Sequence, residues 1–245
     1  MADDAVKSAR RVFEILEYFE RHRRPMALKE ILEGLGYPAS SGSALLKSLV
    51  ALGYLDYDRE RRSYFPTMRI AALGAWVHDS LFGDGQVSRL MNHLYEATGE
   101  TVILAAQSDL HAQYVHLIRS AEPLSVAVPP GARRPLGKSG LGWLLLSVKS
   151  DAEIEKLRRR INAEDGEDKL SREALMAIIS EVRLKGYAFS KHTVSDGVGV
   201  IGALLPATPH GRTYAIGVAG PVERLERKEA LILAELRSGV ERMAA

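Results

Sequence analysis

The order of elements in the first 67 residues restricts the fold more than any other feature of this chain. Apolar side chains recur there at helical spacing in three segments, and two short β-prone segments with a charged turn between them follow. These five segments are residues 6–21, 28–35, 40–52, 54–57 and 63–65. Gly36-Tyr37-Pro38 breaks the chain between the second and third helices. Three helices and a hairpin in this order are typical of a winged helix-turn-helix domain.

The limits of the third helix follow from its flanking residues. Ser40 and Ser41 are residue types that cap helix N-termini, because a hydroxyl oxygen accepts from a free backbone N–H. Gly53 is a natural stop, because glycine adopts the left-handed conformation that ends many helices. We therefore expect the helix to begin at the serines and to end before Gly53.

A linker and a second domain are expected after the hairpin. Residues 68–82 are mostly apolar and predict a linker helix, and such a helix needs a partner surface. Residues 83–85, Gly-Asp-Gly, form a plausible boundary. The predicted organisation is thus a winged helix-turn-helix over 1–67, a linker helix over 68–82 and a second domain over 83–245.

The second domain mixes helical and β-prone segments. We expect strands over 101–107, 113–118, 198–205 and 212–219, and helices over 87–99, 140–148, 150–161, 171–186 and 223–243. Ser150 and Glu153 form a capping box, and 162–169 is expected to be a loop. Strands that are joined by hairpins and surrounded by helices predict an α+β domain with a largely antiparallel sheet.

Composition excludes several classes of protein. The net charge of +2 is too weak to prove nucleic-acid binding, and the absence of cysteine rules out disulfides, thiol nucleophiles and cysteine-ligated zinc. A chain without disulfides fits the cytoplasm. Its N-terminal segment is charged throughout, unlike a signal peptide, and no apolar run approaches the ~18 residues of a membrane span. We expect a cytoplasmic protein without a membrane segment.

No sequence motif points to catalysis, a cofactor or a metal. Gly197, Gly199 and Gly202 spell G-x-G-x-x-G, but an apolar strand contains them, whereas a dinucleotide site needs a strand before and a helix after. No histidine pair lies four residues apart beside a glutamate, as in helical zinc sites. We therefore predict no catalytic residue, no cofactor and no metal site.

Several segments carry a resemblance to one family. They are VKSA at 6–9, LKEI at 28–31, GYPASS at 36–41, LLKSLVALGYL at 45–55, TGETV at 98–102, RRPL at 133–136, LKGYA at 184–188, and the pairs at 197–198 and 220–221. In this order and spacing the chain resembles the IclR-family transcriptional regulators over nearly its whole length. The resemblance implies a dimer or tetramer that binds double-stranded operator DNA. It also implies a GAF-like α/β effector domain whose small-molecule ligand alters operator affinity.

The expected DNA-facing side chains are short. They are Ser40, Ser41, Ser43, Ala44 and Lys47 on the third helix, with Arg61 and Arg62 from the hairpin turn. The family usually carries a long polar residue where Ser43 and Ala44 stand here. Serine can donate to phosphates or base edges, and alanine can touch a thymine methyl, but neither makes the bidentate arginine–guanine pair. We expect weaker direct readout and more reliance on phosphate contacts and DNA shape.

The expected effector site is less polar than is usual in the family. Family pocket positions that are often polar fall on Leu204, Gly217 and Ala219, which favours an effector with an apolar or aromatic body. Ser139, Gly140 and Leu141 could offer a hydroxyl and backbone N–H groups to a carboxylate at a helix start. The remaining candidates for this site are Trp143, His192 and Asp196.

Two other functions stay open at this point. The winged helix could dock another protein, and the short side chains on the third helix give this reading some weight. The larger domain could be an enzyme whose catalytic residues come together only in the fold. Salt dependence separates DNA binding from protein docking, because phosphate binding releases counterions.

Overall fold

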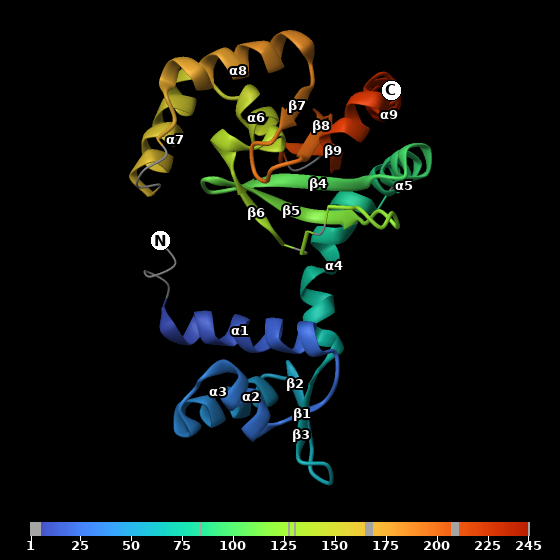
Figure 1. The fold of residues 1–245 in the computed structure, drawn as a ribbon. Helices are drawn as coiled ribbons and strands as arrows, with labels where there is room; N and C mark the ends of the chain where they lie inside the picture. Colours follow the sequence, from blue (N-terminus) through green and yellow to red (C-terminus); the bar gives the residue numbers. More distant parts are fainter. Residues whose placement is uncertain are drawn as a thin grey trace. The chain divides into compact units, whose positions relative to one another are not determined.

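The computed structural model describes residues 6–83, 85–126, 128–129, 131–164, 169–206 and 211–244. The chain divides into two compact units within helix α4 (Met68–Phe82), after Asp79. This division lies a few residues before the Gly-Asp-Gly segment in which we expected the domain boundary. Each unit has its own hydrophobic core (Figure 1).

The N-terminal unit has the predicted order of helices and strands. Its elements are α1 (Lys7–His22), β1 (Met26–Ala27), α2 (Leu28–Leu35), α3 (Ala39–Ala51), β2 (Leu55–Asp58) and β3 (Ser63–Pro66). The strands form an antiparallel sheet in the order β1-β3-β2. β1 was not predicted, because two residues are too few to show a period. The winged helix-turn-helix fold is confirmed.

Close packing explains the glycine inside α3. A Cβ on Gly42 would lie 2.2 Å from Cδ2 of Leu32 on α2, so any larger residue would require the buried Leu32 side chain to move. Glycine at this position costs α3 about 1 kcal/mol of helix propensity relative to alanine. Leu46 and Leu49 on the same face of α3 are buried in the core with Ile15 and Ile31.

The two ends of α3 differ in how well the sequence predicted them. Gly53 has φ of +77° and follows the helix end, where Tyr54 N–H donates to Leu49 O at 2.9 Å, as a Schellman motif requires. The N-cap prediction was wrong. Pro38 holds the N-cap position with extended backbone, and no side chain caps the helix there. Ser40 and Ser41 lie in the first turn instead.

The C-terminal unit is built on one six-stranded sheet. Its strands are β4 (Thr101–Ser108), β5 (His111–Ile118), β6 (Arg133–Pro135), β7 (Ala188–Lys191), β8 (Val198–Leu204) and β9 (Tyr214–Pro221). Its helices are α5 (Gln86–Thr98), the 3-10 turn η2 (Leu136–Lys138), α6 (Gly140–Ser147), α7 (Asp151–Glu164), α8 (Arg172–Lys185) and α9 (Val222–Ala244). The sheet order is β6-β5-β4-β9-β8-β7, and every neighbouring pair is antiparallel.

Both faces of this sheet are covered by helices (Figure 1). The alternation of side chains along a strand sends Ile103 and Ala105 of β4 into one core with α6, α7 and α8. Val102 and Leu104 point the other way, into a second core with α5 and α9. Burial on both faces explains why the central strands are continuously apolar.

Most boundaries in this unit match the expectation. The exceptions are the start of the predicted loop over 162–169 and the two edge strands β6 and β7. Ser150 and Glu153 form the predicted capping box, with Ser150 N–H donating to the Glu153 carboxylate at 2.9 Å and Glu153 N–H donating to Ser150 Oγ at 3.3 Å. The predicted loop over 162–169 is wrong at its start, because α7 continues to Glu164. β6 and β7 were missed, because both are short edge strands without an alternating pattern.

Within the described residues, no helix has both the length and the apolarity that a membrane crossing needs.

Candidate functional site

The outer surface of α3 is a helix face of small polar side chains. Ser40, Ala44 and Lys47 are exposed at a spacing that places them on one face, and Ser43 beside them is partly buried. Ser41 is also partly buried, and its Oγ accepts a hydrogen bond of 3.2 Å from Arg11 Nη1 on α1. Lys47 is thus the long cationic side chain among the predicted DNA-facing residues of this helix.

The turn at the tip of the β2–β3 hairpin holds the other two predicted residues. Asp58 Oδ1 accepts from the backbone N–H groups of Glu60 at 2.9 Å and Arg61 at 3.0 Å, which fixes the turn. Arg62 adopts the left-handed conformation, with φ of +50°. Arg61 and Arg62 are both exposed, and Arg61 Nε lies 3.9 Å from Asp58 Oδ2. The hydrogen-bonded tip therefore carries two exposed cations, and the charge of Arg61 is partly neutralised by Asp58.

A polar cluster fixes the turn between α2 and α3 relative to α1. The Tyr37 hydroxyl donates to the Glu14 carboxylate, and the Arg11 guanidinium lies 4.7 Å from the centre of the Tyr37 ring. Burial, followed by the bond to Glu14, holds the pKa of Tyr37 above its ordinary value, so the phenol remains a donor. Since Arg11 also reaches Ser41, this cluster orients the start of α3.

A cavity of about 190 Å³ lies in the C-terminal unit, where α6 packs on the sheet. Its apolar lining residues are Ile103, Tyr114, Val126, Val128, Leu141, Val194, Val198, Val200 and Ala219. Its polar or small lining residues are Ser125, Arg134, Ser139, Gly140, Ser190, Thr193, Ser195 and Gly199. Of the described residues that line it, Arg134 alone carries a positive charge. The volume suits a small ligand rather than a drug-sized one.

The polar groups of the cavity come from the start of α6, from the two edge strands, and from residues outside the strands at positions 125, 193 and 195. Ser139 precedes α6, is buried, and its Oγ donates to Pro135 O at 2.9 Å. A Cβ on Gly140 would lie 2.7 Å from Ser190 Oγ, so glycine lets the start of α6 approach β7. The Arg134 guanidinium on β6 lies 5.9 Å from the centre of the Tyr114 ring. A cation, a helix start and several hydroxyls therefore surround one small apolar space.

Four of the nine residues expected at the effector site line this cavity: Ser139, Gly140, Leu141 and Ala219. The other five lie elsewhere, for identifiable reasons. Trp143 is on the far side of α6, where its Nε1 donates to Gly137 O at 2.9 Å and its ring borders a separate pocket with Tyr187.

Leu204 packs against the core at the end of β8. Gly217 lies beneath Leu141, because a Cβ there would be 2.8 Å from Leu141 Cδ2. His192 and Asp196 are exposed and border a neighbouring pocket.

Comparison with known proteins agrees with this architecture. The family described as bacterial transcriptional regulator IclR C-terminal matches residues 85–245, and the IclR helix-turn-helix domain matches residues 8–59. The chain belongs to the IclR family of bacterial transcriptional regulators. As in that family, it combines a helix-turn-helix DNA-binding domain with a C-terminal effector-binding domain.

Individual IclR-family relatives are similar at moderate identity. The transcriptional regulator KdgR of Escherichia coli strain K12 is 25% identical over 219 residues, which are 89% of this chain and 81% of that protein. The transcriptional repressor IclR of the same strain is 24% identical over 91% of this chain and 83% of its own length.

Solved structures of the family also match. The effector domain of a regulator named IclR from Acinetobacter sp. ADP1 is 32% identical, with a TM-score of 0.62, over 68% of this chain and 98% of that one. A Rhodococcus sp. RHA1 regulator covers 98% of this chain and 97% of its own, at 20% identity and a TM-score of 0.73.

Several residues that line the cavity were not expected from the sequence. Ser190 and Thr193 were missed because β7 was not predicted, so nothing placed them beside α6. Arg134 lies in the RRPL segment at 133–136, one of the segments that resemble the IclR family. That motif was the sequence signal that could have pointed to Arg134 as a lining residue. Tyr114 looked like an ordinary strand residue. Among the described residues, no group of three or more His, Asp or Glu lies close enough together to hold a metal ion.

Proposed function

We propose that this IclR-family regulator binds operator DNA through the exposed face of α3 and the hairpin tip, and that a small carboxylate with an apolar or aromatic body controls this binding from the cavity. The observation that carries the ligand class is the position of Arg134 in the lining of a mostly apolar cavity. An arginine offers charge-assisted hydrogen bonds to a carboxylate, and the surrounding valines favour a hydrocarbon body. Ser139 and Ser190 supply hydroxyls beside it.

On the DNA side, the proposal assigns direct contacts to Ser40, Ser43, Ala44 and Lys47, with Arg61 and Arg62 entering from the hairpin. Ser41 is assigned a supporting role, since its Oγ already accepts from Arg11. With one long cation on the exposed face of α3, most of the affinity would come from phosphate contacts and DNA shape.

A self-associating regulator fits the exposed surface of α4. Leu73 and Trp76 lie three residues apart on this helix and are 57% and 67% exposed. An apolar helix face of this kind is stabilised by burial against a partner. The proposal is a homo-oligomer that presents two copies of α3 to operator half-sites, which are ~34–36 Å apart when they lie one helical turn from each other.

Benzoate, the simplest aromatic carboxylate, tests the ligand class. We expect calorimetric titration to show benzoate binding to the wild type, and binding weaker by about tenfold or more in Arg134→Gln, because a charge-assisted hydrogen bond is lost. Arg133→Gln is the matched control, since Arg133 is the exposed neighbour on the same strand. Benzamide, which has the same ring without the charge, should bind more weakly than benzoate.

The same variants test control of DNA binding. Benzoate should shift the duplex-binding curve of the wild type and leave that of Arg134→Gln unchanged, because a ligand moves an equilibrium only through its differential affinity for the two states. Equal affinity of wild type and Arg134→Gln for benzoate would contradict the assignment of Arg134.

A further inference from the structure

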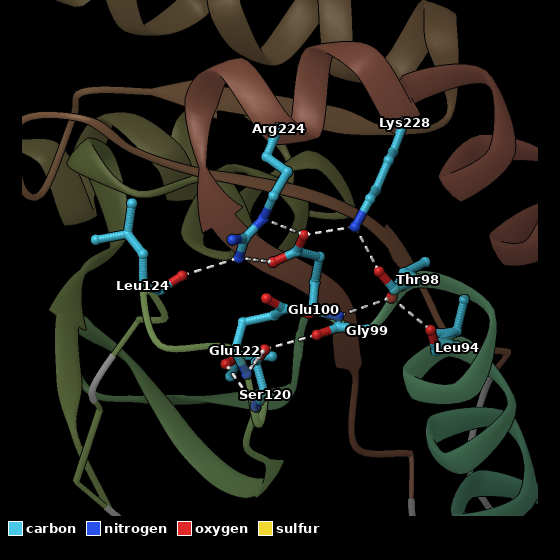
Figure 2. Close-up of polar contacts among 10 residues, drawn as sticks. Leu94, Thr98, Gly99, Glu100, Ser120, Glu122, Leu124, Arg224 and Lys228 are labelled. Carbon is cyan, nitrogen blue, oxygen red and sulfur yellow. Dashed lines mark hydrogen bonds and ion pairs between the residues drawn. The ribbon is translucent and has the colours of Figure 1, made fainter.

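A fully buried carboxylate lies next to β4 and β9, two of the strands that line the cavity. Glu100, at the end of the turn between α5 and β4, is 0% exposed. Arg224 on α9 donates to it from Nε to Oε1 and from Nη2 to Oε2, each at 2.5 Å, and Lys228 Nζ donates to Oε1 at 2.8 Å (Figure 2). Glycine at position 220 makes room for it, because a Cβ there would lie 2.6 Å from Glu100 Oε2.

Arg224 makes one further contact that Lys228 does not. Its Nη2 also donates to the backbone oxygen of Leu124 at 3.0 Å, as Figure 2 shows. The Leu124 side chain is 70% exposed, so burial of this side chain does little to hold the residue in place. The guanidinium therefore connects α9 and the buried carboxylate to the chain at Leu124.

The residues next to Leu124 form part of the cavity wall. Ser125 and Val126 line both the 190 Å³ cavity and the neighbouring pocket that His192 borders. At the other end of the segment 119–126, Ser120 Oγ donates to Gly99 O at 2.6 Å. The segment is thus tied to the turn before β4 near its start and to α9 at Leu124, immediately before the two lining residues.

We infer that Arg224 is a positioning residue for ligand binding: it holds the segment 119–126 so that Ser125 and Val126 close the cavity wall. Glu100 keeps the guanidinium in place, because its bidentate bond to Arg224 fixes the plane from which Nη2 reaches Leu124. Lysine at this position would keep the charge next to Glu100 but could not supply the fork that reaches two partners. This inference rests on the proposed use of the cavity as the effector site.

A spin label at position 124 tests the inference. The chain has no cysteine, so Leu124→Cys provides a single thiol at an exposed site and leaves the backbone oxygen in place. We expect the nitroxide spectrum to show faster motion when Arg224→Lys is added. Lys228→Gln is the matched control, because Lys228 contacts the same carboxylate but not Leu124. It should leave the spectrum unchanged even where it lowers the thermal midpoint.

Benzoate titration of the unlabelled variants completes the test. Arg224→Lys should bind benzoate about tenfold or more weakly than the wild type, and Lys228→Gln should bind it like the wild type. An unchanged label spectrum in Arg224→Lys, or a mobile label with unchanged benzoate affinity, would overturn the inference. If the wild type itself fails to bind benzoate, the proposed ligand class is wrong. The label spectrum then decides by itself whether Arg224 holds the segment.

Discussion

Gly202 on β8 lies so close to Ile216 on β9 that a Cβ at position 202 would stand 2.6 Å from the Ile216 backbone oxygen. The same Cβ would lie 2.9 Å from Leu141 Cδ2 on α6. This glycine therefore permits both the pairing of β8 with β9 and the packing of α6 on them, and the start of α6 lines the proposed ligand site.

Gly202→Ala should lower the free energy of unfolding by about 2 kcal/mol, because a strand backbone must move to accommodate the methyl group. Gly74→Ala on α4 is the opposite case, since nothing lies within 4 Å of the added Cβ. It should raise stability by up to about 1 kcal/mol through helix propensity. Urea unfolding followed by circular dichroism measures both. Equal midpoints for the two variants would refute this account of the packing.

Removal of the buried carboxylate should be costly. Glu100→Gln leaves Arg224 and Lys228 facing a neutral amide, so we expect a loss of about 3 kcal/mol in the free energy of unfolding. Glu226→Gln provides the comparison, because Glu226 pairs with Lys191 at the surface and its loss should cost well under about 1 kcal/mol. The same urea experiment measures both variants, and a similar cost for the two would contradict the role of Glu100.

Glu100 also predicts how stability changes with pH. Burial alone would raise the pKa of Glu100, but hydrogen bonds from Arg224 and Lys228 outweigh burial and hold it below the ordinary 4.5. The folded state therefore favours the ionised form. Its contribution to stability is present above pH 4.5 and is lost as the pH falls through the lowered pKa.

A second carboxylate extends this dependence to more acid pH. Hydrogen bonds from Arg158 and Arg159 hold the pKa of Glu155 at about 2. Urea midpoints measured from neutral to acid pH should therefore fall below pH 4.5, and the fall should be shallower in Glu100→Gln. An equally steep fall in that variant would show that Glu100 is not responsible.

The exposed face of α4 predicts the effect of a charge on self-association. Trp76→Glu should shift the sedimentation equilibrium toward the monomer, because a carboxylate would have to be buried at the proposed interface. Leu184→Glu is the matched control, since Leu184 on α8 is 88% exposed but belongs to the other unit. A monomer shift in both variants, or in neither, would contradict an interface at α4.

The sequence predicted the fold better than it predicted the lining of the cavity, for physical reasons. Amphipathic helices such as α1 have a period that can be read directly, and the central strands β4 and β9 stand out as continuous apolar runs. The edge strands β6 and β7 have three and four residues and no period, and their positions depend on pairing with distant strands. Arg134 and Ser190 lie on these two strands, so the polar side of the cavity was not visible in the sequence.

The direction of a side chain around a buried helix was equally hard to predict. α6 is buried on all sides, so its sequence does not tell which residues face the cavity. Leu141 faces it, whereas Trp143 points to a different pocket. By contrast, α3 has one exposed face, and the positions expected there for Ser40, Ala44 and Lys47 agree with their exposure.

The central claim is that α3 binds DNA, and a salt series on duplex binding tests it most directly. The duplex comes from upstream of the protein's own coding region, and an unrelated duplex serves as the reference. Affinity should fall steeply with salt. Lys47→Ala should weaken binding to both duplexes and reduce the slope of log affinity against log salt by about 1, because one phosphate contact is lost.

Lys29→Ala is the control for this measurement, since Lys29 is an exposed lysine on α2 that pairs with Glu33. It should leave the slope close to that of the wild type. If the folded wild type binds neither duplex at low salt, or binds with no dependence on salt, the account of α3 is contradicted, and docking of another protein by the winged helix becomes the better explanation.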